Sequence, residues 1–299
     1  MNSHNIFAGA FVDRSGHRRE DPDWLAATIA SAKARIVPVW NDRCLVAGEP
    51  PHISTLRHTD IEAFLDPGES IFLGMFRDKP AFAVAVDGDV NAPFEESGEF
   101  HDLRYLGTVL PADEANLAAH AIALIAWHRL QKFCGLCGAH TRPESGGNAR
   151  LCTSDDCANR SFPRVDPAII VLVAHGNECL LGRQRSWPEG RYSTIAGFVE
   201  PGESLEDAVR REVWEETNID VGSVHYHSSQ PWPFPSSLML GFTAFATSRE
   251  IRLNDGELED AGWFTRKELR SGFPKLPYRL SIARRLVDDW LNEVGAEEN

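Results

Sequence analysis

Residues 197–219 join a glycine-containing turn to a segment that is apolar on one side and acidic on the other, and they read GFVEPGESLEDAVRREVWEETNI. Ser204 and Asp207, three residues apart, form a capping box at the start of a helix. The apolar residues after it recur at helical spacing, namely Leu205, Ala208, Val209 and Val213. The pattern predicts a helix from about Leu205 to Thr217 with one buried face and one acidic face.

Three carboxylates crowd the acidic face of this helix. Glu212 and Glu216 are four positions apart and Glu215 is three positions from Glu212, so like charges repel one another by about a few tenths of a kcal/mol. Hard divalent cations such as Mg2+ and Mn2+ prefer carboxylate oxygen, and Mg2+ is held by a few carboxylates together with substrate phosphates. The cluster is compatible with a divalent metal site, but for a Glu-rich helix taken by itself a solvated acidic face is the commoner explanation.

The residues before the helix favour the metal site. Gly197 and Gly202 permit tight turns, and Glu200 and Glu203 add carboxylates at the amino-terminal end. The segment resembles the box of the Nudix hydrolase family, Gly-x5-Glu-x7-Arg-Glu-apolar-x-Glu-Glu-x-Gly-apolar. The matching residues are Gly197, Glu203, Arg211, Glu212, Val213, Glu215, Glu216 and Ile219. Asn218 replaces the last glycine, and asparagine also readily adopts the left-handed conformation at a helix end.

Four of the six cysteines form two close pairs, Cys134 with Cys137 and Cys152 with Cys157. This C-x2-C and C-x4-C spacing is typical of a zinc ribbon. Four thiolates leave no open coordination position, so the spacing predicts a structural Zn2+. Cys179 lies in an apolar run and is expected to pack in a core.

The composition indicates a soluble globular protein of more than one domain. The chain has 299 residues, 42% of them hydrophobic, and carries a formal net charge of -14. The longest apolar stretches are far shorter than the about 20 residues of a membrane span, and the amino terminus lacks a signal-peptide pattern. A cytoplasmic protein without membrane partners is therefore expected. The negative charge disfavours general binding of polyanions, so any contact with nucleic acid should be local.

The pattern of apolar runs and turns predicts three parts: a mixed α/β domain over residues 1–128, the zinc ribbon over 129–163 and a catalytic domain over 164–299. We expect strands over residues 36–40, 44–47, 71–76, 81–86, 168–174, 178–183 and 238–246. Residues 192–197 are expected to lead into the glycine turn. Further helices are expected over 111–130, 265–269 and 278–294. The sequence contains no recognisable internal repeat.

Residues 229–239, SQPWPFPSSLM, form a proline-stiffened segment with two large aromatic side chains. The prolines favour an extended backbone, and Trp232 and Phe234 could stack on a flat ring or anchor the loop to its own domain. Physical reasoning alone favours anchoring. The string SQPWPFPxS, however, resembles the hallmark of the NADH pyrophosphatase branch of Nudix hydrolases. The resemblance covers most of residues 127–286 and is weaker over the amino-terminal domain.

The resemblance implies a Nudix α/β/α sandwich with a mixed sheet, and hydrolysis of the diphosphate of NADH or NAD+ to nicotinamide mononucleotide and AMP. Removal of an NAD cap from RNA would break the same bond. It implies that Glu212, Glu216 and Glu257 bind Mg2+ or Mn2+, with Glu215 sharing the cage. Glu203 would orient the helix or assist proton transfer, and Arg211 would hold the acidic loop through a bidentate pair.

The same resemblance implies a set of substrate contacts: Phe162, Ala196, Gln230, Pro231, Trp232, Pro233, Phe234, Pro235, Ser236, Ser237, Ala283 and Arg104. Phe162 stands where relatives often have tyrosine, and Gly147 stands where some relatives have a contacting acid. For Arg104, a surface salt bridge is an equal alternative.

The expected mechanism is attack of water on one phosphorus while bound metal neutralises the phosphate oxygens and a carboxylate accepts a proton. Glu203, Glu215 and Glu216 all remain candidates for that base. Two other functions stay open: a Nudix hydrolase for ADP-ribose or dinucleoside polyphosphates, and a non-catalytic zinc-ribbon module that binds nucleotide. The proline-aromatic segment argues against the first and the intact acidic box against the second. The resemblance also implies a homodimer.

Overall fold

The computed structural model describes residues 5–65, 68–86, 92–254 and 256–293. The chain forms two compact units. The carboxy-terminal unit comprises Met1–Ile6, Asp166–Trp232 and Ser237–Asn299, and the amino-terminal unit comprises Phe7–Val165 and Pro233–Ser236. Within the described part of the chain, no helix is long and apolar enough to cross a membrane.

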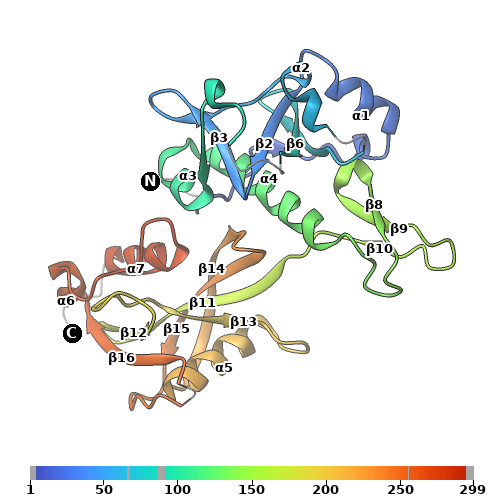
Figure 1. Ribbon diagram of the computed structural model, residues 1–299. Coiled ribbons are helices and arrows are strands. Elements are labelled where there is room, and N and C mark those ends of the chain that lie inside the picture. The colour runs from blue at the N-terminus through green and yellow to red at the C-terminus, as the bar shows by residue number, and fades with distance from the viewer. Residues whose placement is uncertain (1–4, 66–67, 87–91, 255, 294–299) are drawn as a thin grey trace. The chain divides into compact units, whose positions relative to one another are not determined.

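The carboxy-terminal unit is built on a mixed six-stranded sheet in the order β14-β15-β11-β12-β16, with β13 paired to β11 (Figure 1). β11 runs parallel to β15, and the remaining pairs are antiparallel. The strands are β11 (Asp166–His175), β12 (Glu178–Gln184), β13 (Ile195–Phe198), β14 (Val221–Trp232), β15 (Ser237–Ala246) and β16 (Leu258–Thr265).

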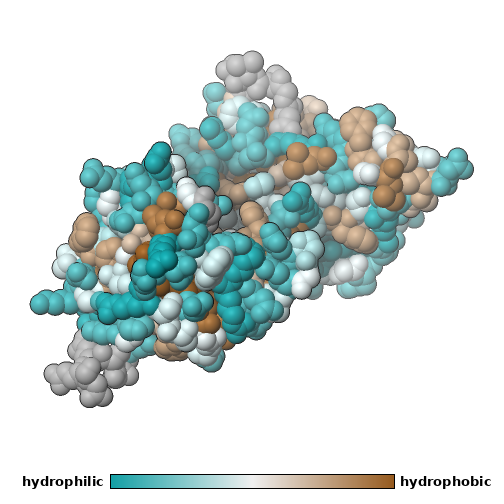
Figure 2. Space-filling view, turned by 90° about the horizontal axis from the view of Figure 1, so that it is seen from below, coloured by the Kyte–Doolittle hydropathy of each residue, from teal (hydrophilic) through white to brown (hydrophobic). Residues whose placement is uncertain are grey.

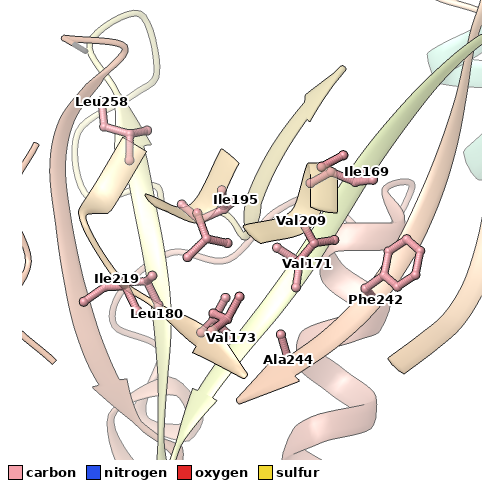
Figure 3. Close-up of a cluster of buried hydrophobic side chains, with 13 residues drawn as sticks. Ile169, Val171, Val173, Leu180, Ile195, Val209, Ile219, Phe242, Ala244 and Leu258 are labelled. Atoms are coloured by element: carbon pink, nitrogen blue, oxygen red, sulfur yellow. The ribbon is translucent and has the colours of Figure 1, made fainter. Parts of the chain in front are cut away.

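Helices cover both faces of this sheet because successive residues of β11 point to opposite sides. Ile169, Val171 and Val173 pack with α5 (Leu205–Thr217) in the cluster drawn in Figure 3. Ile170 and Leu172 pack with α7 (Ile282–Asn292) in a second cluster, which also holds Cys179 and Leu269 of α6 (Arg266–Ser271). The predicted α/β/α sandwich with a mixed sheet is confirmed.

Two predicted segments differ from the structure. The last helix was expected from residue 278, but α7 begins at Ile282 because the Ser281 side chain accepts a hydrogen bond from the amide of Ala283 and caps it. It ends at Asn292, and the predicted end at 294 lies outside the described residues. The expected loop over 229–239 is a hairpin instead: Gln230–Trp232 continue β14, and Trp232 is paired with Ser237.

The amino-terminal unit contains a seven-stranded sheet in the order β1-β5-β6-β2-β3-β4, with β7 paired to β3. Its strands are β1 (Val12–Asp13), β2 (Arg35–Trp40), β3 (Arg43–Ala47), β4 (His52–Ile53), β5 (Ile71–Phe76), β6 (Lys79–Ala85) and β7 (Glu99–Asp102). Its α-helices are α1 (Pro22–Ile29), α2 (His58–Ile61), α3 (Leu103–Val109) and α4 (Ala112–Leu130), and short 3-10 turns cover Gly16–Arg18, Glu62–Phe64, Glu95–Ser97 and Ser145–Gly147.

The central strands of the two units have the same connectivity. β6 runs parallel to β2 and pairs with β5, as β15 runs parallel to β11 and pairs with β14. β3 follows β2 and pairs with β7, as β12 follows β11 and pairs with β16, and two helices come after β7 as after β16. The chain therefore repeats one topology without a recognisable repeat in sequence.

The ribbon is a small antiparallel sheet within the amino-terminal unit, formed by β8 (Thr141–Glu144), β9 (Ala149–Cys152) and β10 (Arg160–Ser161). Asn148 anchors it, because its side-chain amide donates a hydrogen bond of 2.9 Å to the carbonyl of Phe72 in β5.

On the face drawn in Figure 2, hydrophilic residues cover most of the surface and hydrophobic residues form small patches.

Candidate active site

The acidic helix α5 spans the residues that the sequence predicts. The side chain of Ser204 accepts a hydrogen bond from the amide of Asp207 and caps the first turn. Asn218 ends the helix in the left-handed conformation, with φ of 61°, and its amide donates to the carbonyl of Trp214 at 2.7 Å. Asparagine thus takes the conformation that glycine would supply in the box.

Arg211 is the cation at the centre of the acidic cluster. Its guanidinium donates to both carboxylate oxygens of Glu203, at 2.6 and 2.9 Å. It also donates to Glu212 at 2.9 Å, to Glu215 at 3.0 Å and to the carbonyl of Phe198 at the end of β13 at 2.8 Å. One side chain therefore ties three carboxylates to the strand beside the helix.

The carboxylates of the cluster differ in proton affinity. Hydrogen bonds from Arg211 and from the amide of Glu200 lower the pKa of Glu203 from 4.5 to about 2. Burial raises the pKa of Glu212, and the negative charges of Glu215 and Glu257 add to this effect while Arg211 opposes it. Glu203 is the weaker base of the two because its charged form is held by its partners.

Gly197 is required by the position of Glu212. A Cβ placed on Gly197 would lie 1.9 Å from the carboxyl carbon of Glu212, so the carboxylate occupies the space that any other side chain would need. Gly197 sits in β13, where its backbone pairs with Ile169 of β11. The first glycine of the box therefore makes room for a carboxylate and does not relieve a strained backbone.

Glu216 projects from the buried side of α5 and is 4% exposed. It lines a pocket of about 200 Å³ together with Trp232 at the end of β14 and Ala196 in β13. The remaining lining residues are Ile170, Gly182, Gln184, Trp187, Ser193, Thr194, Ile195, Met239, Leu258 and Ser281. The fold therefore joins a carboxylate of the box to an aromatic residue of the hairpin in one pocket.

Several of these pocket residues are not found by reading motifs. Trp187 and Gln184 lie at or beyond the end of a strand without a family pattern, and Ser193 and Thr194 precede β13. The Thr194 hydroxyl is buried without a hydrogen-bond partner among the described residues, so it can bond to a polar group of a ligand. Phe198, next to the cluster, is 60% exposed and also lacks a sequence signal.

Gln230 is 1% exposed and does not line the pocket. Its amide nitrogen donates to the carbonyls of Ile6 and Leu280, at 3.1 and 2.8 Å, and its oxygen accepts from the amide of Ile282 at 2.7 Å. The side chain therefore joins β14 to the start of α7. Ala283, also expected to contact substrate, is 1% exposed in the core beneath α7.

Asn5 is a second support of β14, and no sequence motif predicts it. Its side-chain amide donates to the Ser228 hydroxyl at 3.0 Å and to the Ser229 carbonyl at 2.7 Å, and its oxygen accepts from Arg285 of α7 at 3.2 Å. Asn5 is 7% exposed, so these bonds are shielded from water. A residue far from the box in sequence thus fixes the strand that carries Trp232.

The other expected contacts belong to the amino-terminal unit, which includes the hairpin tip Pro233–Ser236. The guanidinium of Arg104 lies 4.1 Å from the ring centroid of Phe234, in a cation–π contact. Phe7, which is fully buried, packs edge-on against the same ring at 6.4 Å. Phe162 is 64% exposed, with the guanidinium of Arg160 5.6 Å from its ring centroid.

The acidic cluster has the donors that a hard divalent cation requires. Glu212 and Glu216 come from one helix, and Glu257, which acts electrostatically on Glu212, comes from the segment before β16. The negative charges of Glu215 and Glu257 raise the pKa of Glu212, and a cation bound among these carboxylates would relieve the repulsion. Carboxylate donors of this kind suit a hard divalent cation, although among the described residues their oxygens are not already gathered as a group of three or more ligand atoms.

The four ribbon cysteines have ligand atoms that all lie within 4.8 Å of one another, the one such group among the described residues. Sγ of Cys134 is 3.8 Å from that of Cys157, and Sγ of Cys137 is 3.4 Å from that of Cys152. A tetrahedron with Zn–S bonds of about 2.3 Å has edges of about 3.8 Å. Amides of Cys137 and Leu136 lower the pKa of Cys134 to about 6, whereas burial and hydrogen bonds with the neighbouring cysteines raise the pKa of Cys152 to about 12. The group fits Zn2+.

Comparisons with known proteins agree with this architecture. Residues 163–290 match the NUDIX domain, and residues 33–127 match the NADH pyrophosphatase-like rudimentary NUDIX domain. The NAD-capped RNA hydrolase NUDT12 of Homo sapiens is 36% identical over 96% of this chain and 73% of its own length. The chain belongs to the Nudix hydrolase family.

Two further relatives illustrate the range of similarity. The NAD-capped RNA hydrolase NudC of Deinococcus radiodurans is 44% identical over 74% of this chain and 77% of its own length. A solved NUDIX hydrolase from Nitrosomonas europaea, 20% identical, aligns with 55% of this chain and 92% of its own with a TM-score of 0.47. The match to the curated relatives extends beyond the NUDIX domain into the amino-terminal unit.

Proposed function

We propose that this enzyme hydrolyses the diphosphate bond of NADH and NAD+, giving nicotinamide mononucleotide and AMP. The observation that carries the proposal is the pocket in which Glu216 of the acidic helix meets Trp232 of the hairpin. A flat ring can stack on the indole while the diphosphate lies against the carboxylates. The names of the relatives from Homo sapiens and Deinococcus radiodurans support a substrate that contains NAD.

We assign Glu212, Glu215, Glu216 and Glu257 to the binding of Mg2+ or Mn2+. When bound, this metal would supply positive charge to the phosphate oxygens. Arg211 and Glu203 act as positioning residues, since their bidentate pair holds the start of the helix against β13. The catalytic base is then Glu215 or Glu216 rather than Glu203, because two bonds from Arg211 and a pKa of about 2 make Glu203 a poor proton acceptor at neutral pH.

For the substrate, we assign Trp232, Ala196 and Thr194 to direct contact. Gln230 and Ala283 support the pocket from behind, since Gln230 bonds to three backbone groups and Ala283 is buried in the core. Pro231, Pro233, Phe234, Pro235, Ser236 and Ser237 shape the hairpin, with Arg104 stacked on Phe234. Phe162 offers an exposed ring for stacking.

The decisive test is release of AMP from NADH by the full chain with Mg2+ or Mn2+. Glu216→Gln should abolish release while the melting temperature stays close to that of the wild type. Glu206→Gln is the matched control, because Glu206 is exposed on the same helix and lies outside the cluster. Consumption of ADP-ribose with NADH intact would refute the substrate assignment, and no cleavage of either would favour a nucleotide-binding module.

Removal of an NAD cap from RNA is a second activity of the same site, supported by the names of the relatives. Only the first nucleotides of the RNA should contact the protein, since the net charge is -14. Turnover of NADH, NAD+, ADP-ribose and NAD-capped RNA measured side by side would give the preference. Turnover of NADH at least equal to that of the RNA is expected.

We further propose that Zn2+ in the four-cysteine group is structural, and that the domain division falls at 1–128, 129–163 and 164–299. The homodimer remains a prediction. Light scattering of the purified protein measures its oligomeric state, and a monomeric mass at micromolar concentration would contradict the dimer.

A further inference from the structure

The amino-terminal unit contains a cavity of about 800 Å³ that the proposed reaction does not use. This volume lies within the range of about 300–1,000 Å³ that small-molecule sites occupy. The cavity lies against β5 and β6, and its walls come from α1, from α2 and from the β8 end of the ribbon. Its apolar wall consists of Leu25, Ala26, Ile29, Leu65, Phe72 and Phe82.

Two arginines, Arg19 and Arg142, line the rim of this cavity. Among the described residues, no side-chain hydrogen bond or ion pair involves either of them, and the Nε atom of Arg19 is buried and unsatisfied. Arg142 is exposed, whereas Arg19 is partly buried, and a partly desolvated arginine without a partner costs free energy that an anion can recover. The rim therefore offers two guanidinium groups to a ligand.

A further pair of basic residues lies next to Arg19. The guanidinium of Arg14 contacts both ring nitrogens of His120 in α4. Burial lowers the pKa of His120, and the charges of Arg14 and Arg19 lower it further. Arg14 and His120 do not line the cavity, but no carboxylate of the described chain forms an ion pair with Arg14 or Arg19.

The acids that line the cavity are Glu20, Glu62 and Glu144, and Glu20 also acts electrostatically on Arg19. Ser145 donates to Glu20 at 2.7 Å, and Arg160 pairs with Glu144 at 2.7 Å and with Glu20 at 3.7 Å. Glu62, on the opposite wall, is the remaining acid, and His58 is beside it. Arg160 is shared by Glu20 and Glu144, so the charges of Arg19, Arg142 and Arg160 together equal those of the three lining carboxylates. The side chains of Arg19 and Arg142 still have no hydrogen-bond or ion-pair partner among the described residues, so their N–H groups are available to a ligand with one anionic group.

We propose that this cavity binds AMP, with the base against the apolar wall and the phosphate at Arg19 and Arg142. Arginine recognises phosphate through paired N–H donors, and a purine supplies a flat apolar body of suitable size. The nicotinamide of the other product fits less well, because its oxidised ring is a cation. The choice of a nucleotide rests on the proposed function, whose products are mononucleotides; the anion site itself does not.

The neighbouring residues Ala26 and Ala27 of α1 provide a matched test. Both are exposed, but Ala26 lines the cavity and Ala27 does not. Calorimetric titration of the full chain with AMP should show two sites, one in each unit. Ala26→Trp should remove one site and leave kcat/KM for NADH unchanged, whereas Ala27→Trp should keep both. Equal AMP binding by the two variants would overturn the proposal.

The ligand chemistry is tested with fragments and with rim variants. Arg19→Gln and Arg142→Gln should each weaken the site lost in Ala26→Trp by about tenfold, the value of one charge-assisted hydrogen bond. Adenosine and ribose 5-phosphate should each bind there at least about tenfold more weakly than AMP, since adenosine lacks the phosphate and ribose 5-phosphate lacks the base. Adenosine that binds as tightly as AMP would refute the anion site. If NADH is not cleaved while Ala26→Trp still removes AMP binding, the proposed function fails and this inference stands.

Discussion

The two units share the pairing order of their central strands. They differ in the helix that follows the segment paired with the central strand, which is β11 in the carboxy-terminal unit and β2 in the amino-terminal unit. In the carboxy-terminal unit, β13 pairs with β11 and leads into α5, a helix of 13 residues. In the amino-terminal unit, Leu56 forms a single bridge to Ile36 of β2 and leads into α2, a helix of four residues. A sheet of the same topology therefore carries an acidic helix in one unit and a helix of four residues in the other, in keeping with our proposal that the chemistry resides in the helix and not in the fold.

The largest expected difference between the two units is in the loss of turnover when one carboxylate is replaced in each. Glu212→Gln should lower kcat/KM for NADH by at least about a hundredfold, the loss expected when one group that acts on the transition state is removed. Glu62→Gln, placed just after α2, should leave turnover unchanged. Steady-state kinetics with both variants measures this, and comparable losses would mean that the amino-terminal unit contributes to catalysis.

Glycine has opposite roles in the two sheets. Gly197→Ala should displace the Glu212 carboxylate, whose carbon lies 1.9 Å from the new Cβ, and lower activity by about tenfold or more with little loss of stability. Gly74→Ala should instead destabilise the protein by more than about 1 kcal/mol, because Gly74 has φ of 129° and its Cβ would meet the Asp13 carbonyl at 2.2 Å. Denaturation and turnover of both variants separate these effects.

Removal of zinc should affect the amino-terminal unit. Chelation should lower its melting temperature by about 5 °C or more, because the four thiolates would be left crowded without a cation. Cys137→Ser should have the lower melting temperature even without chelator, and adding chelator should not lower it further. An unchanged melting temperature in the wild type would argue against a structural metal.

Asn5→Asp should test the support of the hairpin in the carboxy-terminal unit. The substitution keeps an acceptor for Arg285 but removes both donations to Ser228 and Ser229. We expect KM for NADH to rise about fivefold, equivalent to the loss of one hydrogen bond, with kcat nearly unchanged. A fall in kcat without a change in KM would show that Asn5 does not act through the substrate pocket.

The smallest expected effect is on stability at acid pH. The pKa of Glu203 is lowered from 4.5 to about 2, so its pair with Arg211 stabilises the folded state above about pH 4.5 and loses this effect as pH falls toward 2. The melting temperatures of wild type and Glu203→Gln should differ by a constant amount from pH 7 to 5 and converge below. A constant difference down to pH 3 would contradict this origin.

The sequence predicts well the features that local chemistry sets. The bounds of α5 follow from its cap at Ser204, from the helical spacing of its apolar residues and from Asn218 at its end, all of which are close in sequence. The cysteine group follows from spacing in the same way. Their neighbours in sequence carry the information, so no tertiary structure is needed to find them.

Long-range partners could not be predicted. Gln230 belongs to a motif that implies substrate contact, yet its amide is used by the backbone of Ile6, Leu280 and Ile282. Likewise, Trp187 and Thr194 enter the pocket because strands far apart in sequence meet there. The repeated topology of the two units does not appear as a repeat of residues within this sequence, since strand pairing order is set by hydrophobic burial that many side-chain combinations satisfy.

The bonds of Asn5 have a consequence for the order in which the chain matures. Asn5 leaves the ribosome 224 residues before Ser229 and 280 residues before Arg285. Contacts between residues so far apart in sequence form late, because closing the long loop between them costs conformational entropy before the contacts stabilise the fold. The segment that contains Asn5 must therefore wait, without these partners, while the following 280 residues up to Arg285 are made, and Asn5 supports the hairpin only after α7 has been made.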